Sequence, residues 1–323
     1  MKKFDYLRPQ TLEEALSLLN QYGKKAKLIA GGTDVIVLIK QKGMMPEVLI
    51  SLRGIPGLDQ IQYDGALKIG AMVTHRGIEK SEVIRKEFSA LTDAADVLGS
   101  IQIRNVATIG GNICTAAPSA DTATPLLVLG TQVKIKSLSE ERIVPLEGFF
   151  AGPGETILKK GEMVTEFIVP KPLPHTGSAY WKLQRRLALD LPILGVSVLL
   201  SLDKGRVSCS EMFRTDASIS SILHRMERDE VTCKEVRIGL GVAAPTPIRA
   251  LKAENLMRGK KISAELFEEV ANTASAEAQP RDSIRGEAWY RKDLVRVLVK
   301  RMAMKSVERV VCPEETVFPE RLW

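Results

Sequence analysis

The sequence is poor in residues that bind metals, form disulfides or stack on nucleic-acid bases. Its 323 residues include four cysteines and three histidines, and no two cysteines are spaced as C-x-x-C. No zinc or iron–sulfur site is therefore encoded in any single segment. Aromatic residues make up only 5% of the chain, which leaves little material for a base-stacking surface. We expect no metal site and no nucleic-acid partner.

Long hydrophobic runs are also missing. The longest apolar stretch covers residues 191–202, whereas a membrane-spanning helix needs about 20 apolar residues. The first ten residues, MKKFDYLRPQ, contain two lysines with no apolar segment behind them, unlike a secretory signal. We therefore expect no membrane span and a cytoplasmic location.

Acidic residues are fewer than basic ones. The chain has 46 Lys and Arg against 39 Asp and Glu, a formal net charge of +7, and basic residues are dense between 281 and 305. An excess of positive charge is compatible with an anionic partner. A run of basic residues on a helix is, however, more commonly a face that is exposed to solvent. A basic anion- or nucleic-acid-binding module thus stays open as an alternative. It would bind nucleic acid with strong salt dependence and would be colourless.

The length of the chain predicts two or three domains, because domains cluster at about 100 to 150 residues. The stretch from Pro170 to Gly177 contains three prolines and a glycine and is the best candidate for a boundary. We therefore expect one region over residues 1–175 and a second over 176–323. Helical and strand patterns are mixed in both regions without a repeated βαβ array, so the predicted fold class is α+β.

Local patterns predict the individual elements. A capping box, Thr11-Leu-Glu-Glu14, indicates a helix that ends at Gly23. Residues 35–42 fit a helix or a strand, residues 99–106 a polar loop, and residues 133–144 a hairpin. Further strands are expected at 27–30, 48–52, 67–72, 179–183, 195–202, 206–210 and 235–242, and further helices at 74–80, 87–98, 126–129, 264–278 and 288–305.

Two glycine pairs interrupt this pattern: Gly31-Gly32 after the first predicted strand, and Gly110-Gly111 about eighty residues later. A glycine carries no Cβ to block an approaching anion, and the N–H groups at a helix start add partial positive charge. Either pair alone could be only a tight turn. Two pairs, each flanked by a threonine, suit a ligand that is held at two phosphates, such as a nucleotide with a pyrophosphate bridge.

Five motifs carry a resemblance to a known family. They are AGGTD at 30–34, TIGGNICTAAPSAD at 108–121, KLQRRLALD at 182–190, GLGVAAPTPIRA at 239–250 and SIRGEAWYRKDLVRVLVKRM at 283–302. In this order they resemble the FAD-binding subunit of molybdenum hydroxylases, the family of the flavin subunits of xanthine dehydrogenase and carbon monoxide dehydrogenase. The resemblance implies a two-subdomain FAD-binding region of the vanillyl-alcohol-oxidase/murB (PCMH) type, with subdomains at about 1–60 and 61–175. A small α+β flavoprotein C-terminal domain would follow.

The resemblance also implies FAD as the cofactor and places its contacts. One side of the pyrophosphate would be held by Ile29, Ala30, Gly31, Gly32, Thr33, Asp34 and Val35. The other side would be held by Thr108, Gly111 and Asn112. Asp121 would hold the sugar or ribityl part and Val164 would meet the adenine.

Lys182 is the residue that the resemblance places at the isoalloxazine end of the flavin, with Arg186 and Asp190 near the ring. A cation there stabilises the anionic reduced flavin and raises its reduction potential. Lys182 could instead be a strand-end lysine whose ammonium reaches solvent. No residue of this chain is assigned a catalytic role.

The function implied is electron transfer within a larger oxidoreductase. A small subunit with 2Fe-2S clusters would deliver electrons from a large molybdenum-cofactor subunit, in a heterotrimer that could pair into a dimer, and the flavin would pass them to NAD or another acceptor. The alternative within enzymes is a stand-alone FAD-dependent oxidoreductase of the same fold. Residues 209–233 are longer than the turn usual in the family, and fit a variable surface loop or a partner contact.

Overall fold

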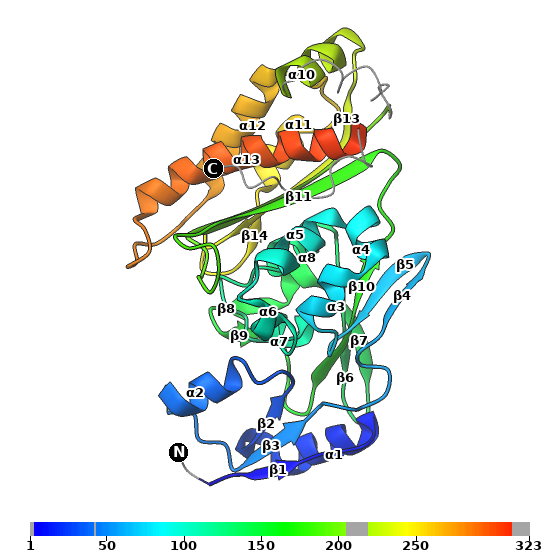
Figure 1. The fold of residues 1–323 in the computed structure, drawn as a ribbon, viewed down its shortest axis with the longest axis vertical. Coiled ribbons are helices and arrows are strands. Elements are labelled where there is room, and N and C mark those ends of the chain that lie inside the picture. The colour runs from blue at the N-terminus through cyan, green and yellow to red at the C-terminus, as the bar shows by residue number, and fades with distance from the viewer. Residues whose placement is uncertain (1–2, 42, 205–218, 312–323) are drawn as a thin grey trace. The chain divides into compact units, whose positions relative to one another are not determined.

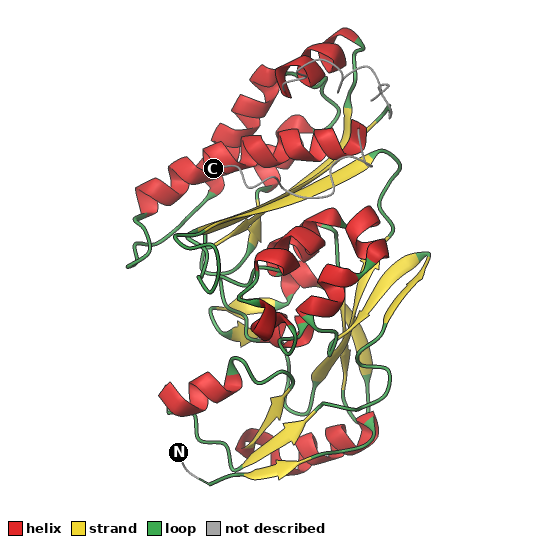
Figure 2. Cartoon of the chain, viewed as in Figure 1, coloured by secondary structure: helices red, strands yellow, loops and turns green. Residues whose placement is uncertain are grey.

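The computed structural model describes residues 3–41, 43–204 and 219–311 (Figure 1). The chain divides into two compact units, and each is described by itself. Unit 1 comprises Met1–Ile78, Leu98–Ala117 and Gly130–Lys171, and unit 2 comprises Glu79–Val97, Pro118–Leu129 and Pro172–Trp323. Both units combine helices with sheets (Figure 2), which confirms the predicted α+β class.

Unit 1 begins with a parallel three-stranded sheet in the order β1-β3-β2. Its strands are β1 (Asp5–Leu7), β2 (Ala26–Ile29) and β3 (Val48–Ser51). Helix α1 (Leu12–Tyr22) follows the predicted cap, because the Thr11 hydroxyl accepts the Glu14 N–H at 3.1 Å. A short 3-10 turn, η1 (Gly23–Lys25), comes before β2. The segment that the sequence allows to be either a helix or a strand is helix α2 (Val35–Gln41).

The second sheet of unit 1 is antiparallel and has five strands in the order β4-β5-β10-β6-β7. The strands are β4 (Ile61–Asp64), β5 (Ala66–Gly70), β6 (Gln132–Lys136), β7 (Glu141–Pro145) and β10 (Met163–Pro170). The predicted hairpin is confirmed, since β6 pairs with β7. Smaller elements are η2 (Leu146–Gly148), β8 (Phe150–Gly152) and β9 (Glu155–Thr156).

Several short helices differ from the predicted pattern. The stretch predicted as a loop contains α6 (Ile101–Arg104), which Ser100 caps, so that prediction was wrong. The helix expected over 87–98 is α5 (Ser89–Val97), and an additional helix that was not predicted, α4 (Glu82–Glu87), ends just before it at the buried, non-helical Phe88. The remaining short helices are α3 (His75–Lys80), α7 (Ile109–Cys114) and α8 (Ala123–Val128).

Unit 2 is built on an antiparallel four-stranded sheet in the order β11-β12-β13-β14. The strands are β11 (Thr176–Leu183), β12 (Leu194–Leu202), β13 (Cys233–Gly241) and β14 (Ile248–Arg249). The helices of its C-terminal part are α10 (Ile219–Arg228), α11 (Leu251–Met257), α12 (Ala264–Glu277) and α13 (Ala288–Val311). Every residue of β12 is buried, as expected for a central strand. The strand predicted at 206–210 lies outside the described residues, as do residues 209–218 of the long segment.

Helix α13 lies against β11 and β12 (Figure 1). A Cβ on Gly177 of β11 would stand 2.1 Å from the Ser306 carbonyl oxygen, so the helix backbone meets the strand where a side chain is missing. The Ser306 hydroxyl donates to the Val198 carbonyl at 2.9 Å. A glycine and a serine thus fix α13 on the two strands.

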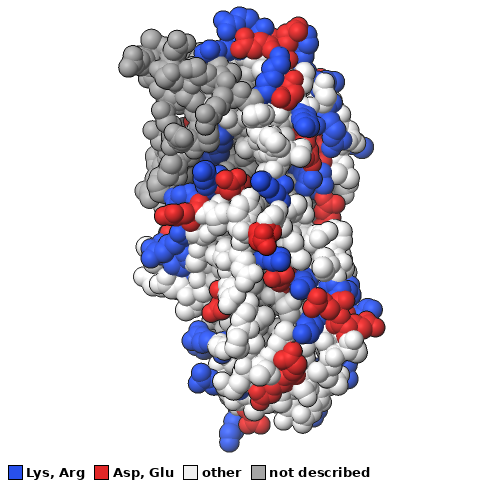
Figure 3. Space-filling model, turned by 90° about the vertical axis from the view of Figure 1, so that its right-hand side faces the viewer, with Lys and Arg blue, Asp and Glu red and all other residues white. Residues whose placement is uncertain are grey.

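Several basic residues of α13 are paired or buried inside unit 2. Glu268 of α12 pairs with Arg296 at 3.2 Å and with Lys300 at 2.6 Å, and Arg291 is buried. On the face drawn in Figure 3, basic and acidic side chains are interspersed. The basic run is therefore not a uniformly solvated cationic face. Neither α13 nor any other helix in the described part of the chain has the length and apolar character of a membrane span.

Candidate functional site

The loop between β2 and α2 carries the first glycine pair. Gly32 has φ = +81°, a conformation that glycine adopts at little cost. Within the described residues, the backbone N–H groups of residues 32–35 donate to no acceptor. Consecutive unengaged N–H groups around a glycine form a concavity that suits an anion. The first pair therefore has the backbone N–H groups expected of a phosphate-binding site.

The second glycine pair lies inside helix α7 and differs in its backbone. The Thr108 hydroxyl caps the helix by accepting the Gly111 N–H at 3.1 Å. The N–H groups of Ile109 and Gly110 donate to carbonyls elsewhere in unit 1, and that of Asn112 donates to the Thr108 carbonyl at 2.9 Å. Unengaged N–H groups, expected at both pairs, are thus found only at the first. The second pair offers an open backbone surface with a threonine and an asparagine.

The first and second glycines of each pair have different surroundings. A Cβ on Gly31 would lie 1.9 Å from the Val106 carbonyl oxygen, and one on Gly110 would lie 2.5 Å from that of Ala71. These two glycines permit close contact between backbones. Because Gly31 touches Val106, the 29–35 loop and the segment leading into α7 lie side by side, so the structure brings together two groups of predicted site residues.

Gly32 and Gly111 are the open members of the pairs. A Cβ on Gly32 would meet only the side chains of Ile29, at 3.3 Å, and Ile36, at 3.6 Å, and one on Gly111 only the Thr108 hydroxyl, at 3.1 Å. Each would project from a partly exposed position. The cradle that a Cβ would fill, together with the N–H groups of residues 32–35, fits a pyrophosphate.

Other predicted residues of unit 1 surround this cradle in different ways. Val35 is buried and packs with Ile29 in a small core, while Asp34 is exposed. Val164 is buried in β10, next to an irregularity in the pairing of β10 with β6. A hydrogen-bonded path connects its neighbour to the second pair: Ala71 donates to the Thr165 carbonyl and accepts the Gly110 N–H, both at 2.9 Å. The assigned contacts of Ile29, Val35 and Val164 with a nucleotide stay predictions.

His75 is a buried residue of unit 1 that sequence reasoning did not single out. Its backbone N–H donates to the Ala107 carbonyl at 3.0 Å, directly before Thr108. Within the described residues, neither ring nitrogen has a hydrogen-bond partner of normal geometry. Burial lowers the pKa of His75 to about 4, against an opposing effect of the Thr108 backbone and with a smaller contribution from Arg104. The ring is therefore neutral at physiological pH.

We expect His75→Leu to reduce the acid sensitivity of the protein. An unfolded histidine titrates near 6.5, so between pH 6.5 and about 4 the unfolded chain binds a proton that the native chain does not. Stability therefore falls as pH drops through this window, by up to about 3 kcal/mol from this group. Thermal unfolding midpoints measured from pH 7 to pH 4 should fall less in the variant. Equal slopes in both proteins would show that His75 is not buried neutral.

Unit 2 brings together two further predicted residues, Asp121 and Lys182. The Lys182 ammonium contacts one Asp121 oxygen at 3.0 Å, and the Tyr180 hydroxyl donates to the other at 2.8 Å. The Lys182 side chain is only 1% exposed, so the alternative of an ammonium that reaches solvent is wrong. Tyr180 belongs to β11, two residues before Lys182, and sequence reasoning missed it because no local pattern marks it.

Burial dominates the electrostatics of this cluster. Desolvation raises the pKa of Asp121, with Lys182 and Tyr180 acting in the opposite direction. Desolvation, the Asp121 charge and the hydrogen bond to it all raise the pKa of Tyr180 well above its usual range. The phenol is therefore neutral, and its O–H donates a hydrogen bond to Asp121. Both Asp121 oxygens are engaged, although each has lone pairs left for a further donor.

The loop between β11 and β12 contains Arg186 and Asp190. Asp190 accepts the N–H groups of Arg185 at 3.1 Å and Leu191 at 3.0 Å, so it orders the loop. Desolvation opposes its charge, but these hydrogen bonds and the two arginines outweigh it and lower the pKa of Asp190. The Arg186 side chain is 67% exposed. The Arg186 side chain therefore faces solvent, whereas the Asp190 side chain is buried.

The described residues contain no group of three or more His, Cys, Asp or Glu placed to hold a metal ion.

Residues 2–172 match the family described as the FAD binding domain in molybdopterin dehydrogenase. Residues 209–306 match the CO dehydrogenase flavoprotein C-terminal domain. The first match covers more than half of the chain.

Individual relatives agree with these matches. The xanthine dehydrogenase FAD-binding subunit of Escherichia coli O157:H7 is 32% identical over 305 residues, with 94% of this chain and 95% of the relative covered. The carbon monoxide dehydrogenase medium chain of Hydrogenophaga pseudoflava is 29% identical, with 93% and 95% covered. A solved carbon monoxide dehydrogenase from Hydrogenophaga pseudoflava superimposes with a TM-score of 0.83 at 30% identity, with 96% of this chain and 99% of that chain covered.

Proposed function

The chain belongs to the family of FAD-binding subunits of molybdenum hydroxylases of the xanthine and carbon monoxide dehydrogenase type, and from this premise we propose that it transfers electrons between partner subunits and a final acceptor. It is an oxidoreductase subunit, and its cofactor is FAD. The fold is that of the carbon monoxide dehydrogenase medium chain, an FAD-binding region followed by a flavoprotein C-terminal domain. We propose boundaries at 1–175 and 176–323 for these regions.

The geometry that supports the proposal best is the pair of contacting glycine segments in unit 1. The N–H groups of residues 32–35 would hold one side of the pyrophosphate, and Thr108, Gly111 and Asn112 the other. Bound FAD supplies redox chemistry that accepts electrons singly and releases them in pairs. The protein residues hold and orient that group. Asp121 would hold the ribityl or sugar part, and Lys182 would keep a cation near the isoalloxazine.

We propose two partner subunits, a small one with 2Fe-2S clusters and a large one with the molybdenum cofactor, in a heterotrimer that could pair into a dimer. Two observations support this. Several relatives are themselves named as a medium chain or as a subunit of a dehydrogenase complex, and the described residues contain no cluster of metal-binding side chains. NAD is the candidate acceptor that we propose to test first.

The test is a visible absorption spectrum of the purified chain, followed by mass analysis of the small molecule released on denaturation. One FAD per chain supports the assignment, and a colourless protein that takes up no added FAD contradicts it. Anaerobic addition of NADH then tests the acceptor, because NADH should bleach the flavin if NAD exchanges electrons with it. Sustained turnover of the isolated chain with a small reductant would favour the stand-alone oxidoreductase instead.

A further inference from the structure

Helix α5 and strand β11 of unit 2 contact each other at three evenly spaced positions. The contacting pairs are Ser89 with Ser178, Asp93 with Tyr180, and Val97 with Lys182. The helix residues are four apart and the strand residues two apart. Four residues of an α-helix rise about 6 Å and two residues of a strand about 6.6 Å, so the contacts stay in step along the helix and the strand.

The contacts cover the free edge of the sheet. Strand β11 pairs with β12 on one side only, and an uncovered edge leaves backbone groups without partners. The Tyr180 N–H donates to the Asp93 carboxylate at 3.1 Å, and the Ser178 carbonyl accepts from the Ser89 hydroxyl at 2.7 Å. Ala90 of α5 packs on Tyr180, and its small side chain permits this close approach.

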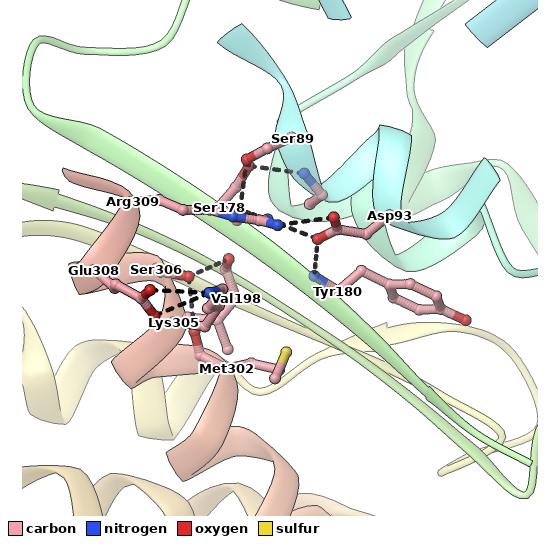
Figure 4. Close-up of polar contacts among 11 residues, drawn as sticks. Ser89, Asp93, Ser178, Tyr180, Val198, Met302, Lys305, Ser306, Glu308 and Arg309 are labelled. Atoms are coloured by element: carbon pink, nitrogen blue, oxygen red, sulfur yellow. Dashed lines mark hydrogen bonds and ion pairs between the residues drawn. The ribbon is translucent and has the colours of Figure 1, made fainter. Parts of the chain in front are cut away.

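The central contact is strengthened by Arg309 of α13. Figure 4 shows its side chain reaching past β11 to Asp93. The guanidinium binds both carboxylate oxygens, at 2.6 and 2.8 Å, and also donates to the Ser178 carbonyl at 2.6 Å. Desolvation opposes the guanidinium charge, but Asp93 outweighs it and raises the pKa of Arg309. One buried ion pair therefore joins α5, β11 and α13.

The last contact in the series holds Lys182. Its ammonium donates to the Val97 carbonyl at 3.3 Å, at the C-terminus of α5, and to Asp121 at 3.0 Å. The carbonyls at a helix C-terminus favour a cation. A displacement of α5 along β11 would remove the Val97 carbonyl from Lys182 and leave only Asp121.

We propose that Asp93 is a positioning residue for Lys182: it accepts the Tyr180 N–H and so holds β11 on α5, with Lys182 between the Val97 carbonyl and Asp121. The part of this proposal that concerns the flavin rests on the proposed function, because only the resemblance places Lys182 at the isoalloxazine. Asp93 then acts on the flavin without touching it, through the backbone N–H of Tyr180, and Arg309 compensates the charge of the buried Asp93 carboxylate. The critical feature is an acceptor at position 93 for that N–H group.

The same unit contains a second clamp that serves as a matched control. Glu254 of α11 accepts the Ile238 N–H of β13 at 2.8 Å and pairs with Arg249 at 2.5 Å. It has the chemistry of the Asp93 clamp: a helix carboxylate that accepts a strand N–H and binds an arginine. It acts on β13 rather than β11, so breaking it should disturb unit 2 to a similar extent without moving Lys182.

Three double variants of the full chain separate the possibilities. Asp93→Asn/Arg309→Met removes both charges but keeps an oxygen that accepts the Tyr180 N–H. Asp93→Leu/Arg309→Met removes both charges and that acceptor. Glu254→Leu/Arg249→Met is the control on β13. Each avoids a lone buried charge, which is the usual reason for a failed fold when one partner of an ion pair is removed.

The first readout does not depend on FAD. Reductive methylation with mass analysis reports whether the Lys182 ammonium is protected, and we measure it on FAD-free protein. Only the Leu/Met variant at positions 93 and 309 should be methylated at Lys182 faster than wild type, by about tenfold or more. Equal protection in all four proteins, or equal loss in the control, would overturn the proposal.

The second readout is the reduction potential of bound FAD. The Leu/Met variant at 93 and 309 should make reduction about tenfold less favourable, which is about 30 mV for a two-electron couple, and the other two double variants should stay near wild type. Asp121→Asn/Lys182→Met is the reference for loss of the lysine. If the potential of the Asp121→Asn/Lys182→Met protein equals that of wild type, Lys182 does not lie near the flavin and the proposed site is contradicted. The methylation result would still decide whether Asp93 positions Lys182.

Discussion

Gly111→Ala should bind FAD more weakly while the protein stays as stable as wild type or becomes slightly more stable. Gly111 is in helix α7, where alanine is favoured over glycine by up to about 1 kcal/mol. The new Cβ would meet only the Thr108 hydroxyl, at 3.1 Å. It would nevertheless occupy the cradle proposed for the pyrophosphate, and overpacking of roughly 1–3 kcal/mol corresponds to about five- to 150-fold weaker binding. FAD titration and thermal unfolding of the FAD-free proteins measure the two effects.

The neighbouring glycine supplies the control for this prediction. Gly110→Ala would place its Cβ 2.5 Å from the Ala71 carbonyl oxygen, so backbone must move, and we expect lower stability as well as poor FAD binding. Gly32 is less useful, because at φ = +81° any larger side chain is strained whatever binds nearby. Wild-type FAD affinity in Gly111→Ala would show that the pyrophosphate does not approach this face of α7.

The local parts of the structure could be predicted from the sequence. Helix α1 follows the Thr11 cap, and the β6–β7 hairpin follows its alternating pattern. Helix α6 was missed although its signal was present, since Ser100 is a good N-cap residue and accepts the Ile103 N–H at 3.4 Å. Helix α4 was missed in the same way, since Ser81 accepts the Ile84 N–H at 3.5 Å and caps that helix.

The sequence located the glycine pairs but could not assign a role to each glycine. Gly31 and Gly32 are identical in a sequence, and they differ because Val106, far along the chain, touches one and not the other. The buried ion pairs were beyond sequence reasoning for the same reason. Asp93 and Arg309 are 216 residues apart, and no local pattern states which distant charges meet. Lys182 was identified only through the family resemblance, and the resemblance did not predict its pairing with Asp121.

Lys182→Met should destabilise the protein strongly, and more so at high pH than at low pH. The substitution leaves the Asp121 carboxylate buried with Tyr180 as its remaining partner, and removing one member of a buried ion pair costs roughly 3–5 kcal/mol. Desolvation already raises the pKa of Asp121, and loss of the cation should raise it further. We expect the deficit to be largest at pH 8 and smaller at pH 5, by urea unfolding at both values.

The sign of this pH dependence follows from linkage. A carboxyl whose pKa is higher in the folded state than in the unfolded state binds an extra proton on folding, so its stabilising contribution is complete below the unfolded pKa and is lost as pH rises through the folded pKa. The variant should therefore gain stability, relative to wild type, as pH falls. Asp121→Asn/Lys182→Met should recover most of the loss and show no such trend, because the amide carries no charge and still accepts the Tyr180 hydroxyl proton. A Lys182→Met protein with wild-type stability at both pH values would mean that the Asp121 charge is not buried, and the cluster could not then hold a cation at a fixed place beside a flavin.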